Sequence, residues 1–253
     1  MVEIWARRDE PETADLRRVI HAANALQDDP SSPVHLRAFA WRLVVDTHRA
    51  AGWSLPTDVS FASCRAAADS LFHACSLLTA EVAAQLRGAD GPSLLLGGLA
   101  DSQSVFGRWD LVPADGAVLV ALDRREETYV DPADLPVTNG VHWVGAGASH
   151  QLYRQLTTTA TLETSEVLVP RPELVAARVA NAGLRPDDPA ALVFCGAAFV
   201  TEDWDEVTRI AKGLGRAPAL YEAAVALGLE QYLGVKAGGV QKWLRAVKRA
   251  ARR

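Results

Sequence analysis

The chain has 253 residues, a formal net charge of −5 at pH 7 and an isoelectric point near 5.7. Its mean hydropathy of +0.03 and its 49% of apolar residues exclude an intrinsically disordered chain. The acidic balance argues against broad nucleic-acid binding, and the absence of roughly 18 consecutive apolar residues argues against a membrane-spanning helix.

Cysteine usage and the first ten residues favour a reducing compartment. Cys64, Cys75 and Cys195 cannot all pair within one chain, and they show neither a CxxC motif nor a Cys/His metal-ligand spacing. Residues 1–10 carry no apolar run of signal-peptide length. We therefore expect a cytoplasmic protein whose cysteines are buried small hydrophobic residues.

The first third of the chain predicts three helices, over residues 14–26, 34–51 and 58–87. The longest of them ends at Gly88. Its apolar residues recur at spacings of four and three and form one stripe: Leu71, Cys75, Leu78, Val82 and Leu86.

The middle of the chain changes to short apolar segments that predict strands. Residues 93–96 form a wholly apolar run after the first serine and lead into Gly97-Gly98. Residues 117–122 are compatible with a strand or a helix, because a short apolar run does not decide by periodicity. Further strands are expected at residues 109–112, 140–144 and 166–170.

From Pro172 onward the sequence predicts helices again. Their expected starts are Pro172, Asp187-Asp188-Pro189, Asp203 and Arg216. A last amphipathic segment has seven Lys and Arg residues and no acid from Lys236 onward, with Trp243 on its apolar face. We expect Trp243 to pack against the body of the protein, and the alternative is that this basic helix contacts a protein partner.

These elements together predict the α+β class, with a small mixed sheet flanked by N-terminal and C-terminal helical regions. We divide the chain into an N-terminal helical region over residues 1–90, a strand-containing core over 91–170 and a C-terminal helical region over 171–253. One compact unit is expected, because each short apolar strand needs cover on its faces.

Four segments resemble a family of uncharacterised bacterial nucleotidyltransferases, over about residues 33 to 233. The matching segments are Leu94-Leu95-Leu96-Gly97-Gly98, Arg108-Trp109-Asp110-Leu111-Val112-Pro113, Gly140-Val141-His142-Trp143 and Val169-Pro170-Arg171-Pro172-Glu173-Leu174. In that family a strand ends in Lys-Gly, a second reads Asp-x-Asp-Leu-Leu-Val-Pro and a third reads Asp-Leu-His-Trp. The resemblance implies a nucleotidyltransferase-like sheet.

The resemblance also implies that the metal site is degenerate. Nucleotidyl transfer uses two Mg²⁺ ions about 4 Å apart, and clustered carboxylates must hold them. The family's three acids correspond here to Arg108, Asp110 and Gly140, so two of the three are missing. No cofactor is firmly implied, and Mg²⁺ with a nucleoside triphosphate enters only if nearby acids replace the lost ones. The candidates for replacement are Asp101, Asp115, Asp123, Asp131 and Asp134.

The candidate site consists of Gly97, Gly98, Arg108, Asp110 and His142. The glycine pair either lets backbone N–H groups approach a phosphate or forms only a tight turn. Arg108 is a candidate for binding an anionic group of a small molecule or peptide, and Asp110 for orienting it or taking a proton. His142 is a candidate general base, although a lone histidine on an apolar strand is more often a core residue.

Three functions remain open at this point, and enzymatic activity is undecided. The favoured hypothesis is a binding or accessory protein, or a repurposed enzyme, whose fold has lost its metal-dependent chemistry. Family relatives occur in bacterial operons that include ones making modified peptides, so the resemblance suggests an accessory role in biosynthesis. The alternatives are an active Mg²⁺-dependent nucleotidyltransferase with a rearranged acid set, or an interaction or antitoxin-like module.

Overall fold

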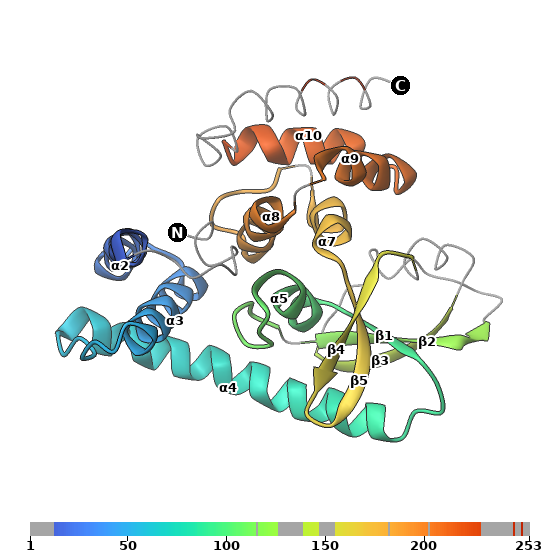
Figure 1. Ribbon diagram of the computed structural model, residues 1–253, viewed down its shortest axis with the longest axis horizontal. Coiled ribbons are helices and arrows are strands. Elements are labelled where there is room, and N and C mark those ends of the chain that lie inside the picture. The colour runs from blue at the N-terminus through green and yellow to red at the C-terminus, as the bar shows by residue number, and fades with distance from the viewer. Residues whose placement is uncertain are drawn as a thin grey trace.

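The computed structural model describes residues 13–114, 116–125, 139–146, 155–181, 183–201 and 203–228, together with Arg245 and Arg249. The described residues form eight helices and one five-stranded mixed sheet, which confirms the α+β class (Figure 1). None of the described helices is long and apolar enough to cross a membrane.

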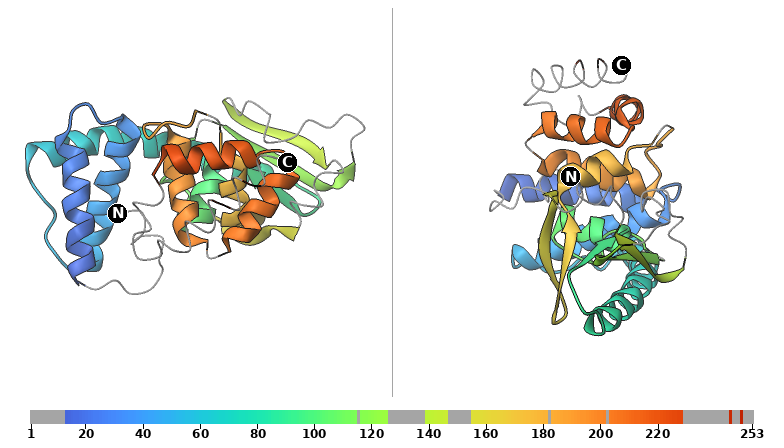
Figure 2. Two further views of the ribbon diagram at one scale, coloured as in Figure 1. Left: turned by 90° about the horizontal axis from the view of Figure 1, so that it is seen from above. Right: turned by 90° about the vertical axis from the view of Figure 1, so that its right-hand side faces the viewer.

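Three helices form the N-terminal part: α2 (Thr13–Asp28), α3 (Val34–Ala50) and α4 (Val59–Arg87). Asp58 begins α4, because its carboxylate accepts a hydrogen bond of 2.8 Å from the Phe61 backbone N–H. α2 and α3 pack side by side at one end of the molecule, away from the sheet (Figure 2). All three helices were expected from the sequence.

The sheet has the strand order β3-β2-β1-β5-β4. β1 lies antiparallel to β2 and parallel to β5, β2 lies parallel to β3, and β4 lies antiparallel to β5. The strands are β1 (Ser93–Leu96), β2 (Gly116–Arg125), β3 (Gly140–Ala146), β4 (Thr157–Leu162) and β5 (Ser165–Pro170). The register of the central pair places Leu96 opposite Val118.

Helices cover both faces of the sheet. α4 runs along one side of the molecule from the α2–α3 pair to the sheet, where its apolar stripe packs on alternate residues such as Leu95 and Leu119 (Figure 1). The residues between them, such as Leu94 and Val118, face a second and larger core with the C-terminal helices. Burying both faces explains why β1 reads as a continuous apolar run.

Five further helices complete the described fold: α5 (Gly98–Phe106), α7 (Pro172–Val179), α8 (Pro189–Val200), α9 (Trp204–Gly213) and α10 (Ala217–Ala226). The expected helix starts after Arg171, Asp188 and Asp203 are confirmed. The Asp203 carboxylate accepts a hydrogen bond of 2.9 Å from the Glu206 backbone N–H. Trp243 lies outside the described residues.

The predicted strand at residues 109–112 is wrong. These residues form bends that return along α5, where the Leu111 backbone N–H donates to the Ser102 hydroxyl over 3.0 Å. The place beside β1 is taken instead by β2, which contains the ambiguous segment 117–122. All six residues of the 117–122 segment are apolar and buried, as a strand covered on both faces requires, whereas Trp109 and Asp110 are only partly buried.

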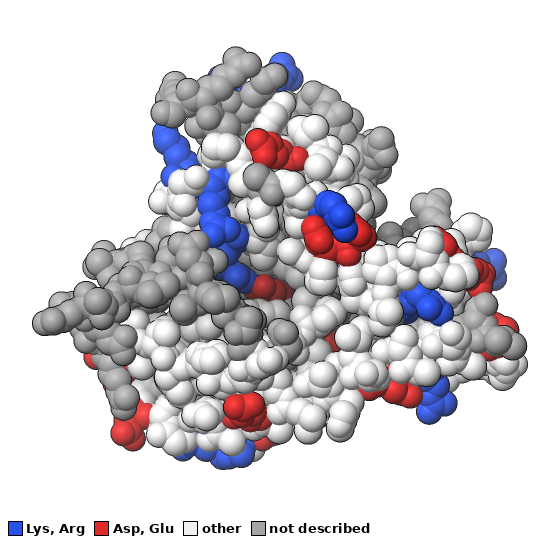
Figure 3. Space-filling view, turned by 180° about the vertical axis from the view of Figure 1, so that it is seen from behind, with Lys and Arg blue, Asp and Glu red and all other residues white. Residues whose placement is uncertain are grey.

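Charged side chains are interspersed over the surface shown in Figure 3. On this face, the acidic and basic residues among the described positions lie in small adjacent groups rather than in one broad basic area. This distribution accords with the net charge of −5.

Candidate functional site

The glycine pair forms the tight entry from β1 into α5. Gly97 has a φ of +112°, a backbone conformation that favours glycine, and it caps the N-terminus of α5. A Cβ on Gly98 would lie 2.8 Å from the Pro113 carbonyl oxygen and 3.0 Å from the Ala114 Cβ. The two glycines are therefore required by the turn and by the close packing of residues 113–114.

Arg108 and Asp110 belong to a cluster that we call the α3 charge network, made of Arg42, Asp46, Arg108 and Asp110. The Arg108 Nε lies 3.1 Å from an Asp110 carboxylate oxygen, and its Nη1 bonds the Asp46 carboxylate. Arg42 on α3 lies 3.1 Å from Asp46 and 3.5 Å from Asp110. Two guanidinium groups thus meet two carboxylates, and the network is formally neutral.

The environment of the α3 charge network is partly buried. The side chain of Asp46 is 13% exposed, while that of Arg108 is 29% exposed. Burial raises the pKa of the Asp46 carboxyl, and the charge and hydrogen bond of Arg42 oppose that shift. The ion pairs of Arg108 with Asp46 and Asp110 fasten the 107–113 segment to α3.

The structure does not bring Arg108 and the glycine pair together. Gly97 precedes the first turn of α5, and Arg108 follows its last residue. A nine-residue helix is about 13 Å long at 1.5 Å per residue, which separates the two positions. The sequence grouped Arg108, Asp110 and the glycine pair as one candidate site beside a strand at residues 109–112, and that strand does not form.

His142 is exposed on β3, so its interpretation as a core residue is wrong. β3 lies beside β2 and is separated from β1 by that strand. Two strand spacings place it about 10 Å from β1. In the sheet register His142 lies beside Val118, and Val118 lies beside Leu96.

The acids proposed as replacement metal ligands lie in different surroundings. Asp101 is buried in α5 and bonds the guanidinium of Arg178 on α7. Burial raises its pKa, and Arg178 opposes the shift. Asp123 is exposed on β2, whereas Asp115, Asp131 and Asp134 lie outside the described residues. In the described part of the chain, no three His, Cys, Asp or Glu side chains are grouped as a metal site.

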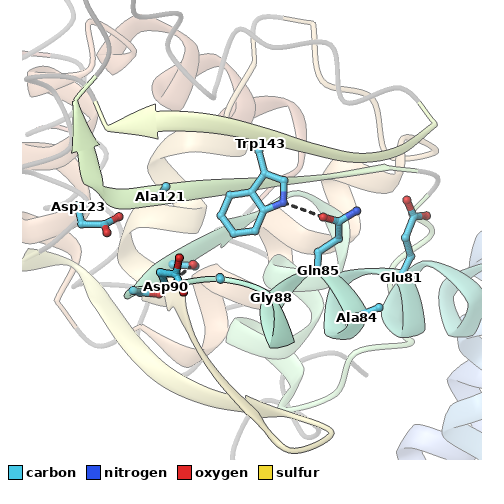
Figure 4. A pocket seen from close by; sticks show the side chains of 11 residues that line it. Glu81, Ala84, Gln85, Gly88, Asp90, Ala121, Asp123 and Trp143 are labelled. Atoms are coloured by element: carbon cyan, nitrogen blue, oxygen red, sulfur yellow. Dashed lines mark hydrogen bonds between the residues drawn. The ribbon is translucent and has the colours of Figure 1, made fainter.

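A cavity of about 610 Å³ opens where the C-terminal end of α4 meets β2 and β3 (Figure 4). We call it the acidic pocket. Its lining residues come from α4, from the turn that follows it and from three strands: Glu81, Ala84, Gln85, Gly88, Ala89, Asp90, Gly91, Ser93, Ala121, Asp123 and Trp143. Among the described residues, this lining contains three carboxylates and no Lys, Arg or His.

Trp143 forms one wall of the acidic pocket. Its indole N–H donates a hydrogen bond of 3.0 Å to the Gln85 side-chain oxygen, and the residue remains 38% exposed. In Figure 4 the carboxylates of Asp90 and Asp123 lie on one side of the indole and that of Glu81 on the other. None of these three carboxylates has a hydrogen bond or ion pair with another described residue.

Sequence reasoning found only part of this pocket. It named Trp143 only as part of the Gly140-Val141-His142-Trp143 segment, and Asp123 as a possible replacement ligand. It missed the contribution of α4, although Glu81, Gln85 and Gly88 recur at spacings of four and three and share one helix face. That spacing was the signal available in the sequence. It does not reveal the pocket by itself, because Trp143, which bonds Gln85, lies 58 residues away in the sequence.

Comparison with known proteins gives no identification of the chain. No protein-family model, no curated protein and no solved structure matches it significantly. The resemblance to nucleotidyltransferases therefore stays a prediction from the residues.

Proposed function

We propose that the chain is a ligand-binding or accessory protein on a nucleotidyltransferase-like scaffold that does not perform two-metal nucleotidyl transfer. The single observation that carries this proposal is the engagement of Asp110. Its carboxylate lies 3.1 Å from Arg108 and 3.5 Å from Arg42, so both of its oxygens face guanidinium groups. A carboxylate that is already paired with two guanidinium groups has little charge left for a divalent ion.

The scaffold part of the proposal is supported by the β1–glycine unit. Gly97-Gly98 directly follows the buried strand β1, in the place where the resembled family's strand ends in Lys-Gly, and it leads into α5. The departure lies in the next segment, where Asp110 is in a bend rather than on a strand. We therefore propose that this segment has become a structural connection to α3.

The ligand-binding part of the proposal is supported by the acidic pocket. Its volume of about 610 Å³ is in the range of small-molecule sites, and its wall includes an exposed aromatic side chain. The expectation of an anionic ligand depends on Arg108, but Asp46 and Asp110 already pair with the charge of that side chain. We accordingly place binding at the acidic pocket, and an accessory role in biosynthesis remains the role that the family resemblance implies.

Calorimetric titration tests this proposal. ATP, GTP, CTP and UTP should each bind no more tightly with Mg²⁺ than without it, and incubation with radiolabelled triphosphates should transfer no nucleotidyl group. Mg²⁺-dependent transfer that is lost in Asp110→Asn but retained in Asp69→Asn would overturn the proposal. Asp69 is a suitable control because its ion pair with Arg65 is exposed on α4.

A further inference from the structure

The acidic pocket differs from the charged clusters elsewhere in the described chain, because Glu81, Asp90 and Asp123 have no cation among the lining residues whose side chains the structure describes. We propose that it binds the guanidinium or ammonium group of an organic ligand, with Trp143 against the ligand's apolar or planar part. This inference rests on the proposed function, since it names the ligand class of that binding site.

The charge of the pocket selects the sign of the ligand. Three carboxylates of one sign in a hollow repel one another and raise the local concentration of cations. Arg87, three residues before Asp90 in the sequence, does not neutralise them, because its guanidinium is 2.9 Å from Glu163 on the β4–β5 turn. A cationic ligand would supply the missing charge.

The indole provides the second element of recognition. A cation over the face of a tryptophan ring is attracted by the negative potential of that face. The hydrogen bond to Gln85 holds the ring in place, and carboxylates lie on either side of it in Figure 4. A cation at the ring would therefore have carboxylates on both sides of it.

The turn after α4 leaves room for the Asp123 carboxylate. A Cβ on Gly91 would lie 2.8 Å from an Asp123 carboxylate oxygen, so only glycine permits this approach without a shift of Asp123. An organic cation suits this arrangement better than a bare metal ion, because the carboxylates are spread around about 610 Å³ and form no metal-ligand group among the described residues.

Nitrogen-15 NMR of the Trp143 indole N–H, assigned with Trp143→Phe, reports on this pocket alone. The probes are agmatine, the peptide Gly-Gly-Arg-Gly-Gly and the same peptide with uncharged citrulline in place of arginine. We expect saturable shifts with agmatine, with the arginine peptide or with both, which distinguishes a free amine from a peptide source. The citrulline peptide should produce none, and added NaCl should weaken the response.

The variant Glu81→Gln/Asp90→Asn/Asp123→Asn removes three charges that would attract the cation. It should lower the probe affinity by roughly tenfold or more, which corresponds to a loss of about 1.4 kcal/mol in binding free energy. The matched control Glu166→Gln/Asp205→Asn/Glu222→Gln removes three exposed carboxylates elsewhere and should bind as the wild type does. Unfolding curves establish that both variants are folded.

Equal shifts with arginine and citrulline peptides, no shift with any probe, or equal weakening by both triple variants would overturn the inference. The nucleotidyl-transfer assay on the same wild-type sample separates the two proposals. Without transfer and without cation binding, only this inference fails. Mg²⁺-dependent transfer that requires Asp110 defeats the proposed function itself.

Discussion

The α3 charge network and the acidic pocket both contain acidic side chains near the surface, yet they treat charge in opposite ways. In the network each carboxylate faces guanidinium groups, as Asp110 does with Arg42 and Arg108. In the pocket Asp90 and Asp123 face a cavity whose described lining residues include no cation. The difference indicates that the network serves the fold, and that the pocket is where charge remains available for a ligand.

The largest expected effect on stability comes from removing the cation of a buried ion pair. Arg178→Met leaves the Asp101 carboxylate uncompensated in α5, and we expect a loss of roughly 3–5 kcal/mol in the free energy of unfolding at pH 7. Urea unfolding measures this loss. A loss below about 1 kcal/mol would show that the pair does not hold α5 to α7.

This loss should depend on pH. Burial raises the pKa of Asp101 above its ordinary value of 3.8, so the folded state takes up the proton at a higher pH than the unfolded chain does. The carboxyl group therefore favours folding at low pH, and that contribution falls as the pH rises through the folded-state pKa. The destabilisation in Arg178→Met should shrink as the pH is lowered toward 3.8, and a loss that stays constant would contradict this account.

The next effect concerns the α3 charge network itself. Arg108→Met removes charge-assisted hydrogen bonds to Asp46 and Asp110 and should lower the free energy of unfolding by about 1.5–3 kcal/mol. Arg65→Met is the matched control, because the Arg65–Asp69 pair on α4 is mostly exposed and should contribute at most about 1 kcal/mol. Equal losses in the two variants would remove the reason to treat the network as structural.

A smaller effect tests the glycine turn. In Gly98→Ala the new Cβ meets the Pro113 carbonyl oxygen at 2.8 Å, so the backbone must shift, and we expect a loss of roughly 1–3 kcal/mol. Gly213→Ala is the control, because a Cβ there meets nothing within 4 Å and alanine favours the helix. Thermal unfolding of both variants measures the contrast, and an unaltered Gly98→Ala protein would show that residues 113–114 do not constrain this turn.

The sequence predicted most helices and strands because their signals are local. The apolar stripe of α4 and the apolar run of β1 each lie within one element. The strand prediction for residues 109–112 failed because it used only their local apolar character. The position of this segment depends on contacts such as that of Asp110 with Arg42, which is far away in the sequence. The same reason hid the pocket, since Trp143 and Gln85 meet only when β3 packs near α4.

One pair of substitutions tests the central claim most directly, because it makes the same chemical change in both regions. Asp110→Asn leaves Arg42 and Arg108 with one carboxylate, whereas Asp123→Asn removes a charge that has no partner among the described residues. Urea unfolding of the two variants side by side should show a loss above about 1 kcal/mol for Asp110→Asn and a change within about 0.5 kcal/mol for Asp123→Asn. Equal effects, or the reverse order, would contradict the assignment of Asp110 to the fold and of Asp123 to the binding site.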